Sequence, residues 1–286
     1  MLAPKLRLRG LLRVRDRNFV WGARTYLMGI VNVTPDSFSG DGTPDSVQAI
    51  SRALEQANGG ADIVDIGAES TRPGHSPVEE QVESERLLPV IHGLRERLGS
   101  HAVISADTFK PAVFRKAHAA GADILNSVWG LSDELLAAAV ECEAPVVIMH
   151  NKAVPSYERD VVDEVLAFLD AAAARANDAG IARDHIILDP GIGFGKLPDH
   201  NIALLSALKR LVALGFPTLL GSSRKSTIGK VTGKEPNART YGTAATVALA
   251  IAAGIDMVRV HDVAQMRDVA RMSDAIVRGW RPHDWI

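Results

Sequence analysis

The sequence has little of what marks secreted, membrane-spanning or nucleic-acid-binding proteins. Cys142 is its single cysteine, so an intrachain disulfide cannot form, and we expect a reducing, cytoplasmic setting. The longest apolar stretch, residues 244–255, is too short to cross a bilayer. Arginines interrupt every apolar run near the N-terminus, so we expect no secretory signal there. The formal net charge of -2 gives no support to nucleic-acid binding.

Low-complexity segments and long linkers rich in proline, glycine or serine are also missing, which favours a single domain. The 286 residues are 47% hydrophobic, enough for a sizeable core without disulfides or metals. We expect one domain over residues 1–286, with an N-terminal hairpin over 1–26, the main body over 27–277 and a tail over 278–286.

The hairpin is predicted from residues 6–26, where apolar and charged side chains alternate. We place its turn at residues 16–18. The segment carries several arginines, which are Arg7, Arg9, Arg13, Arg15 and Arg17. We expect them to form one solvated face rather than a nucleic-acid site.

The main body repeats one pattern: an apolar segment, a polar or glycine-rich turn, then a helical segment. The predicted strands are residues 26–33, 62–66, 103–106, 123–125, 145–149, 186–188, 218–220 and 257–260. The predicted helices are residues 44–58, 78–98, 111–120, 133–142, 160–179, 200–214, a short one from 226, 239–253 and 263–276. Several helices end in a glycine suited to a left-handed cap, namely Gly60, Gly121, Gly180, Gly215 and Gly254.

This succession of strand–helix units over roughly 250 residues predicts an α/β protein with the (β/α)8 TIM-barrel fold. The main alternative is an open, doubly wound sheet, which usually has a glycine-rich phosphate-binding turn after its first strand. Here the first strand leads into Thr34-Pro35-Asp36, which is no such turn.

Polar residues follow nearly every predicted strand, and in such a barrel the active site is built at those strand ends. They are Asn32, residues 69–72, Asp107, Asn126, His150, Asp189, Lys225, Arg259 and His261. An Asp before a helix is often only a cap, and an Asn at a strand end is often only a turn residue. Because so many strand ends carry hydrogen-bonding groups, we favour a polar pocket over that ordinary interpretation.

The chemistry of this pocket divides in two. One group of side chains suits a flat heterocycle with N–H donors and a carbonyl, such as a 2-amino-4-oxo pteridine: Asp107, Asn126, Asp189 and Lys225, with Met149 and Phe194 as apolar faces. The other group suits an anion with a hard cation: Arg259, His261 and Asn32, whose amide oxygen could ligate Mg²⁺. Residues 221–226 lead into a helix N-terminus, which favours anions, but they lack the P-loop spacing.

Five segments together resemble the dihydropteroate synthase family: residues 28–39, 65–74, 188–196, 221–226 and 259–263. The resemblance covers residues 6–276, with the motifs in the family's order. It implies a transferase of folate biosynthesis that joins 6-hydroxymethyl-7,8-dihydropterin diphosphate to 4-aminobenzoate. The products would be 7,8-dihydropteroate and pyrophosphate, formed by Mg²⁺-assisted loss of pyrophosphate and attack of the arylamine on a pterin cation.

The resemblance also implies roles for individual residues. Catalytic roles fall to Asp36, Lys225, Arg259 and His261. The pterin would be bound by Asp107, Asn126, Met149, Asp189, Phe194, Lys225 and Arg259. The diphosphate would be bound by Asn32, Arg259 and His261, with Asn32 also the metal ligand. 4-Aminobenzoate, and sulfonamides competing with it, would be bound by Phe38, Thr71, Arg72, Pro73 and Ser226. A homodimer through helices 239–253 and 263–276 is expected as well.

The chain departs from the family's usual pattern at Ser127, at Asn151 and within residues 39–42. Two alternatives accompany the synthase interpretation. A methyltetrahydrofolate–corrinoid methyltransferase would also bind a pterin in a barrel, but would not need Lys225 or the pair of Arg259 and His261. A non-catalytic pterin-binding paralogue would fit the loop changes.

Overall fold

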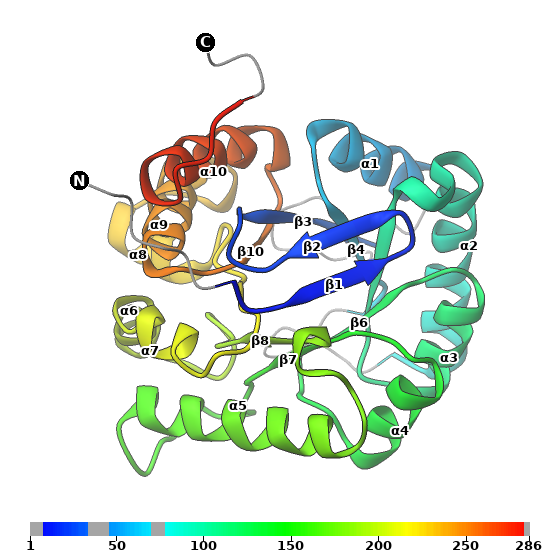
Figure 1. Ribbon diagram of the computed structural model, residues 1–286, viewed down its shortest axis with the longest axis horizontal. Coiled ribbons are helices and arrows are strands. Elements are labelled where there is room, and N and C mark those ends of the chain that lie inside the picture. The colour runs from blue at the N-terminus through cyan, green and yellow to red at the C-terminus, as the bar shows by residue number, and fades with distance from the viewer. Residues whose placement is uncertain (1–7, 34–45, 70–77, 283–286) are drawn as a thin grey trace.

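The computed structural model describes residues 8–33, 46–69 and 78–282. Within these residues, eight parallel strands form one sheet in the order β8-β7-β6-β5-β4-β3-β10-β9. A bridge between Leu188 and Thr218 joins its two ends, and the Leu188 amide donates to the Pro217 carbonyl at 2.9 Å. The sheet thus closes into a barrel ringed by helices, as Figure 1 shows, and the predicted (β/α)8 fold is confirmed.

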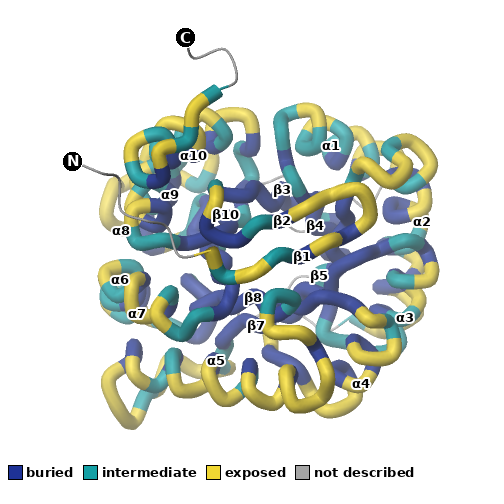
Figure 2. The backbone as a smooth tube through the Cα atoms, in the orientation of Figure 1, coloured by how far each residue is buried: buried dark blue, intermediate teal, exposed yellow. Residues whose placement is uncertain are grey.

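The strands are short apolar runs because both of their faces are buried. Their bounds are β3 (Tyr26–Asn32), β4 (Ile63–Gly67), β5 (Val103–Asp107), β6 (Ile124–Ser127), β7 (Val146–Met149), β8 (Ile186–Asp189), β9 (Leu219–Leu220) and β10 (Met257–Val260). Alternate residues point to opposite faces of a sheet. One set packs under the helices, and the other set fills the barrel interior, as the buried centre in Figure 2 shows.

The outer helices follow the strands in turn. They are α1 (Ser46–Gly59), α2 (Glu80–Leu98), α3 (Pro111–Ala119), α4 (Asp133–Glu141), α5 (Val161–Asp178), α6 (Pro198–Ser206), α7 (Leu208–Val212), α8 (Ser226–Thr232), α9 (Thr240–Ala253) and α10 (Val263–Val277). The helix predicted over 200–214 is two helices, because Ala207, with φ −102° and ψ 11°, leaves the helical region between them. The predicted glycine caps are confirmed, with Gly254 at φ +101° as an example.

The N-terminal hairpin consists of β1 (Leu11–Val14) and β2 (Arg17–Val20), lying across the amino-terminal end of the barrel (Figure 1). Val14 pairs with Arg17, so the turn is Arg15-Asp16 and its prediction at 16–18 was wrong. Arg15 adopts φ +50°, a left-handed conformation that a two-residue hairpin turn requires. Apolar side chains of the hairpin pack directly on the lowest layer of the barrel interior.

The hairpin arginines do not all face solvent as predicted. Arg9 forms an ion pair with the buried Asp256, just before β10, and Arg15 forms one with Asp123, just before β6. Arg17 donates from Nε to the His101 carbonyl at 3.0 Å. Buried carboxylates at the strand starts need cationic partners, and these arginines supply them, so they fasten the hairpin to the barrel. None of the helices among the described residues is long and apolar enough to span a membrane.

Candidate active site

The barrel interior changes from apolar to polar along the strands. Its lowest layer is apolar and includes Met28, Ile63, Val103, Ile124, Val147, Ile187, Leu219 and Met257. Because side chains alternate, the residues two positions further along face the same interior. That second layer contains Asp65, Ser105, Asn126, Met149, Asp189 and Arg259. Two positions further still come Asn32, Asp107 and His261. The two-residue alternation of side chains along each strand therefore brings these polar groups together, at the carboxyl end of the barrel.

Arg259 lies at the centre of the second layer. Its Nε donates to Asp65 Oδ2 at 2.6 Å, and its Nη2 donates to Asp107 Oδ2 at 2.7 Å. Asn126 Nδ2 also donates to Asp65 Oδ2, at 3.1 Å. The pKa of Arg259 is raised, because the two neighbouring carboxylates favour its charged form by more than burial disfavours it. Arg259 therefore stays charged and bridges the two carboxylates, which come from successive layers of the pocket.

Each of these two carboxylates has one oxygen that accepts no hydrogen bond within the described residues. Asp65 Oδ1 and Asp107 Oδ1 are buried, and within the described residues no donor reaches either of them. Burial raises the pKa of Asp107, although Arg259 opposes this. A buried acceptor without a donor is unfavourable, and a ligand with N–H groups would relieve it. The pocket floor is therefore suited to a ligand rich in donors.

Asp189 presents a third carboxylate at the end of β8. Its Oδ1 accepts from the Gly191 amide at 2.7 Å, which fixes the side chain. Burial raises its pKa to about 6. Gly221, after β9, lies opposite, where an added Cβ would be only 3.4 Å from Asp189 Oδ2. Glycine at that position keeps the second oxygen of Asp189 accessible to a ligand.

The glycine-rich loop after β8 packs against the segment after β7. Gly191, at φ +70°, leaves no room for a side chain, because a Cβ would lie 1.9 Å from the His150 carbonyl oxygen. Gly195, at φ +57°, is as tightly held, with a Cβ 2.2 Å from the Lys152 carbonyl oxygen. Both positions combine a left-handed backbone with close approach, which only glycine allows at low cost.

Lys196 joins this loop to the segment after β7 by hydrogen bonds. Its Nζ donates to the carbonyls of Phe194 at 3.0 Å and His150 at 3.2 Å, and it lies 2.9 Å from His150 Nδ1. Burial lowers the pKa of His150 to about 3, so its neutral ring accepts the bond. Burial also lowers the pKa of Lys196 to about 7. Sequence reasoning placed His150 at a strand end but missed its connection to Lys196.

Lys225 lies against Phe194, and both were predicted to line the pocket. The Lys225 ammonium lies 3.7 Å from the centre of the Phe194 ring, a cation–π contact. Phe194 in turn packs with Met149 and Val128 in a small buried cluster. An apolar wall and a cation therefore stand beside the carboxylates, as a flat polar ring would require.

Two of the three groups predicted to bind an anion, Asn32 and His261, lie one layer above Arg259. His261 Nδ1 is 3.0 Å from Ser223 Oγ, and its main-chain amide donates to the same oxygen at 3.2 Å. Asn32 ends β3, which lies between β4 and β10. Ser226 is exposed and begins α8. Within the described residues, no group of three or more His, Cys, Asp or Glu side chains could hold a metal ion.

Some predictions fall elsewhere. Asp36, Phe38, Thr71, Arg72 and Pro73 lie outside the described residues. Glu69, expected at the pocket rim, accepts from the Val78 amide at 3.0 Å and pairs with Lys110, so it anchors the start of α2.

Sequence reasoning also missed Asp65. Two signals were available: its place two positions after Ile63 on an otherwise apolar strand, and its position at the start of the family-like segment 65–74.

The comparisons with known proteins agree with this geometry. Residues 28–261 match the family model described as pterin binding enzyme. The dihydropteroate synthase of Synechocystis sp. is 44% identical over 280 residues, or 94% of this chain and 95% of that protein. This chain belongs to the dihydropteroate synthase family. One departure from the family's usual pattern lies behind the pocket, where the Ser127 hydroxyl bonds within its own turn to the Gly130 carbonyl.

Solved synthases have the same fold. The Clostridium difficile dihydropteroate synthase, determined in the presence of pteroic acid, superposes with a TM-score of 0.85 at 45% identity, covering 90% of this chain and 98% of that one. The Thermus thermophilus synthase in complex with 6HMPPP superposes with a TM-score of 0.82 at 42% identity, covering 93% and 100%. It has also been solved with 4-aminobenzoate. Membership of this family does not favour the methyltransferase or the non-catalytic alternative.

Proposed function

We propose that this chain condenses 6-hydroxymethyl-7,8-dihydropterin diphosphate with 4-aminobenzoate, forming 7,8-dihydropteroate and pyrophosphate. The observation that carries the proposal is the pair of buried, donor-free oxygens of Asp65 and Asp107 on either side of Arg259. A pterin offers an amino group and ring N–H groups as donors for such acceptors. The relatives solved with pteroic acid, 6HMPPP and 4-aminobenzoate support the same substrates here.

The pterin would lie in the second layer, with Asn126 and Asp189 bonding to its edge. Lys225, whose ammonium sits over Phe194, would meet the pterin carbonyl, and Met149 would face the ring. A carboxylate accepts paired N–H bonds, whereas an ammonium can only donate. The orientation of the ring would follow from this asymmetry.

The diphosphate would then extend into the third layer toward Asn32 and His261. Departure of pyrophosphate is the difficult step, because negative charge grows on the leaving oxygen while the pterin carbon becomes cationic. Arg259 and His261 would stabilise that growing charge. The carboxylates at the ring end would favour the cationic pterin, so no covalent nucleophile is required.

We propose Mg²⁺ as the cofactor, with Asn32 as its protein ligand. The donor set fits: one amide oxygen at the end of β3 stands beside the strand that leads to Arg259 and His261. Mg²⁺ is typically held by few protein groups together with substrate phosphates and water. When bound, it would supply further neutralisation of the leaving diphosphate.

4-Aminobenzoate would bind at the rim, with its carboxylate at Ser226 and the start of α8. Phe38, Thr71, Arg72 and Pro73 are proposed to complete this site, and Asp36 to assist catalysis from the first loop. Sulfonamides, which share the anilino group, would compete with 4-aminobenzoate and not with the pterin.

We also propose a homodimer and a cytoplasmic location. The outer faces of α9 and α10 expose large apolar side chains, among them Tyr241 at 90% and Ile276 at 71%. Apolar faces of this kind are typically covered in C2 dimers. Light scattering that gave a monomer mass at micromolar concentration would contradict the dimer. The free thiol of Cys142 supports a reducing, cytoplasmic location.

The decisive experiment measures pyrophosphate and dihydropteroate from the purified chain. We expect product only with both substrates, loss of turnover when Mg²⁺ is chelated, and a strong decrease in His261→Ala. A chain that binds the pterin diphosphate but releases no pyrophosphate would be a non-catalytic paralogue. Sulfonamide inhibition competitive with the pterin, and indifferent to 4-aminobenzoate, would contradict the proposed rim site.

A further inference from the structure

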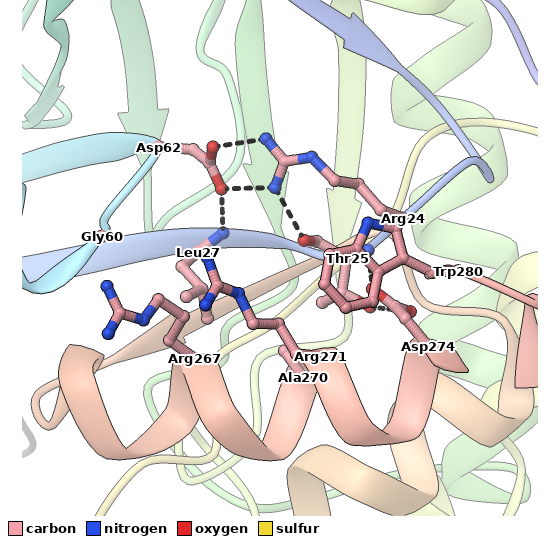
Figure 3. A pocket seen from close by; sticks show the side chains of 10 residues that line it. All are labelled: Arg24, Thr25, Leu27, Gly60, Asp62, Arg267, Ala270, Arg271, Asp274 and Trp280. Atoms are coloured by element: carbon pink, nitrogen blue, oxygen red, sulfur yellow. Dashed lines mark hydrogen bonds and ion pairs between the residues drawn. The ribbon is translucent and has the colours of Figure 1, made fainter. Parts of the chain in front are cut away.

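A second pocket lies at the start of β3, at the opposite end of that strand from Asn32. Its volume is about 260 Å³, and its walls come from the turns before β3 and β4, from α10 and from the segment after α10. Three arginines and an indole dominate the lining: Arg24, Arg267, Arg271 and Trp280. Figure 3 shows Arg267 and Arg271 extending from α10 below the Arg24–Asp62 pair, with Trp280 at one side.

The two carboxylates of this pocket are already engaged by protein groups. Asp62 accepts two hydrogen bonds from Arg24, at 2.6 Å and 3.0 Å, and a third from the Leu27 amide at 2.9 Å. Asp274 accepts from the Thr25 amide at 2.7 Å and from its hydroxyl at 2.9 Å, and pairs with Arg278 at 3.2 Å. Neither carboxylate is therefore available to neutralise further cations.

Arg267 and Arg271 are the two cations of the pocket that no carboxylate of the described residues neutralises. They stand one turn apart on α10, and within the described residues neither forms an ion pair. Nε of Arg267 is buried without a hydrogen-bond partner. Like charges at this spacing destabilise a helix, and a buried donor without an acceptor adds to that cost. An anion between the two guanidinium groups would satisfy both conditions.

Neighbouring residues hold these side chains in place. Gly60 has φ +103°, and a Cβ there would lie 2.7 Å from Arg267 Cδ, so only glycine lets Arg267 lie against the end of α1. The Trp280 amide donates to the Asp274 carbonyl at 3.2 Å, which holds the backbone at Trp280 against the end of α10. The Arg271 guanidinium carbon is 5.9 Å from the centre of that ring.

We propose that this pocket binds a small aromatic phosphomonoester, with its phosphate between Arg267 and Arg271 and its ring against Trp280. Two uncompensated guanidinium groups match a dianion better than a single carboxylate, and their planar forks suit phosphate oxygens. The volume is slightly below the usual range for ligand pockets, which limits the organic part to one ring. This site is separate from the proposed synthase site and uses none of its residues.

The test is calorimetric titration of the full chain with phenyl phosphate, in parallel with inorganic phosphate. Arg271→Gln is the main variant because its side chain is exposed, and Arg267→Gln is the second. Arg13→Gln is the matched control, since it removes one exposed arginine on the hairpin, away from the pocket. Thermal melting of each variant verifies that it folds.

We expect the dissociation constant for phenyl phosphate to rise about tenfold or more in either pocket variant and to stay unchanged in the control. Trp280→Ala should remove the preference for phenyl phosphate over inorganic phosphate. Dihydropteroate formation should be unaffected in Arg271→Gln. Equal binding by wild type, both pocket variants and control would overturn the proposal, because the phosphate would then be bound elsewhere, as at Arg259 and His261.

Discussion

At the amino-terminal end of the barrel, Phe19, Trp21 and Tyr26 close the interior with ring centres 4.9 Å to 5.7 Å apart. At the carboxyl end, the same strands present Arg259 between two carboxylates. The first region buries aromatic and aliphatic surface, and its Trp21 indole donates to the Asp184 carbonyl at 2.9 Å. The second buries charge and leaves acceptors unused.

The difference shows how one barrel separates stability from function along its axis. The apolar layer and the hairpin that covers it contribute to the free energy of unfolding without approaching a substrate. The polar layer holds groups whose partners are incomplete in the protein alone, which is expected where a ligand supplies the rest. Substitutions in the apolar region should therefore lower stability and leave activity unchanged. Substitutions in the polar region should lower activity with little effect on stability.

The largest effect is expected in the apolar region. Trp21→Ala should lower the free energy of unfolding by about 3–5 kcal/mol, because it leaves a cavity under the hairpin and an unused carbonyl at Asp184. Urea denaturation measures this, with Trp21→Phe as the milder control. The kcat of the folded fraction should not change, and a loss of kcat at full folding would show that the two regions are coupled.

Next comes Arg259→Lys in the polar region. An ammonium keeps the charge but cannot hold Asp65 and Asp107 at once, as the guanidinium fork does. We expect kcat/KM to fall about 10²–10³-fold, a range typical of losing one transition-state donor. Steady-state kinetics beside a urea curve would separate this loss from any change in stability. Unchanged kinetics would remove Arg259 from the leaving-group role.

Asp189→Asn should have a smaller effect, confined to the pterin. The amide oxygen can still accept from the Gly191 amide, so the loop should keep its conformation. The other end of the side chain becomes a donor, and pterin binding should weaken by about 1–3 kcal/mol. Calorimetry with the pterin alone measures this directly. Equal affinity in wild type and variant would show that Asp189 does not contact the ring.

Pterin binding should also depend on pH through Asp189. Since burial raises its pKa to about 6, the carboxylate becomes protonated as pH falls through 6, and it then accepts N–H bonds poorly. Affinity should decrease by about tenfold per pH unit below that point.

Stability of the ligand-free protein should change in the opposite sense. A raised pKa in the folded state contributes stability that is present at low pH and is lost as pH rises through about 6. Asp189→Asn provides the control for both measurements, because its curves should flatten in this range.

The smallest effect is expected for Lys196→Met. It removes the ammonium that bonds to two carbonyls beneath the glycine-rich loop, which should let Phe194 and Lys225 drift apart. We expect the KM for the pterin to rise by about fivefold, or about 1 kcal/mol, with kcat nearly unchanged. Lys196→Arg should restore part of the difference. A fall in kcat at constant KM would assign Lys196 to chemistry rather than positioning.

Much of this arrangement is local, and the sequence by itself determined it. Strands with apolar runs, helices that end at glycines such as Gly60 and Gly254, and their alternation predict a barrel. Parallel strands bring their carboxyl ends to one rim, so Asp107, Asn126 and Asp189 could be assigned to one pocket before any contact was known.

Only the tertiary structure decided which of these side chains pair. Arg259 and Asp65 are 194 positions apart, and their bond exists because β10, β3 and β4 are neighbours in the closed barrel. The Lys196–His150 contact and the hairpin arginines paired with Asp256 and Asp123 arise in the same way. A period of two residues determines the direction of a side chain, but its partner depends on which strands and loops meet when the chain closes.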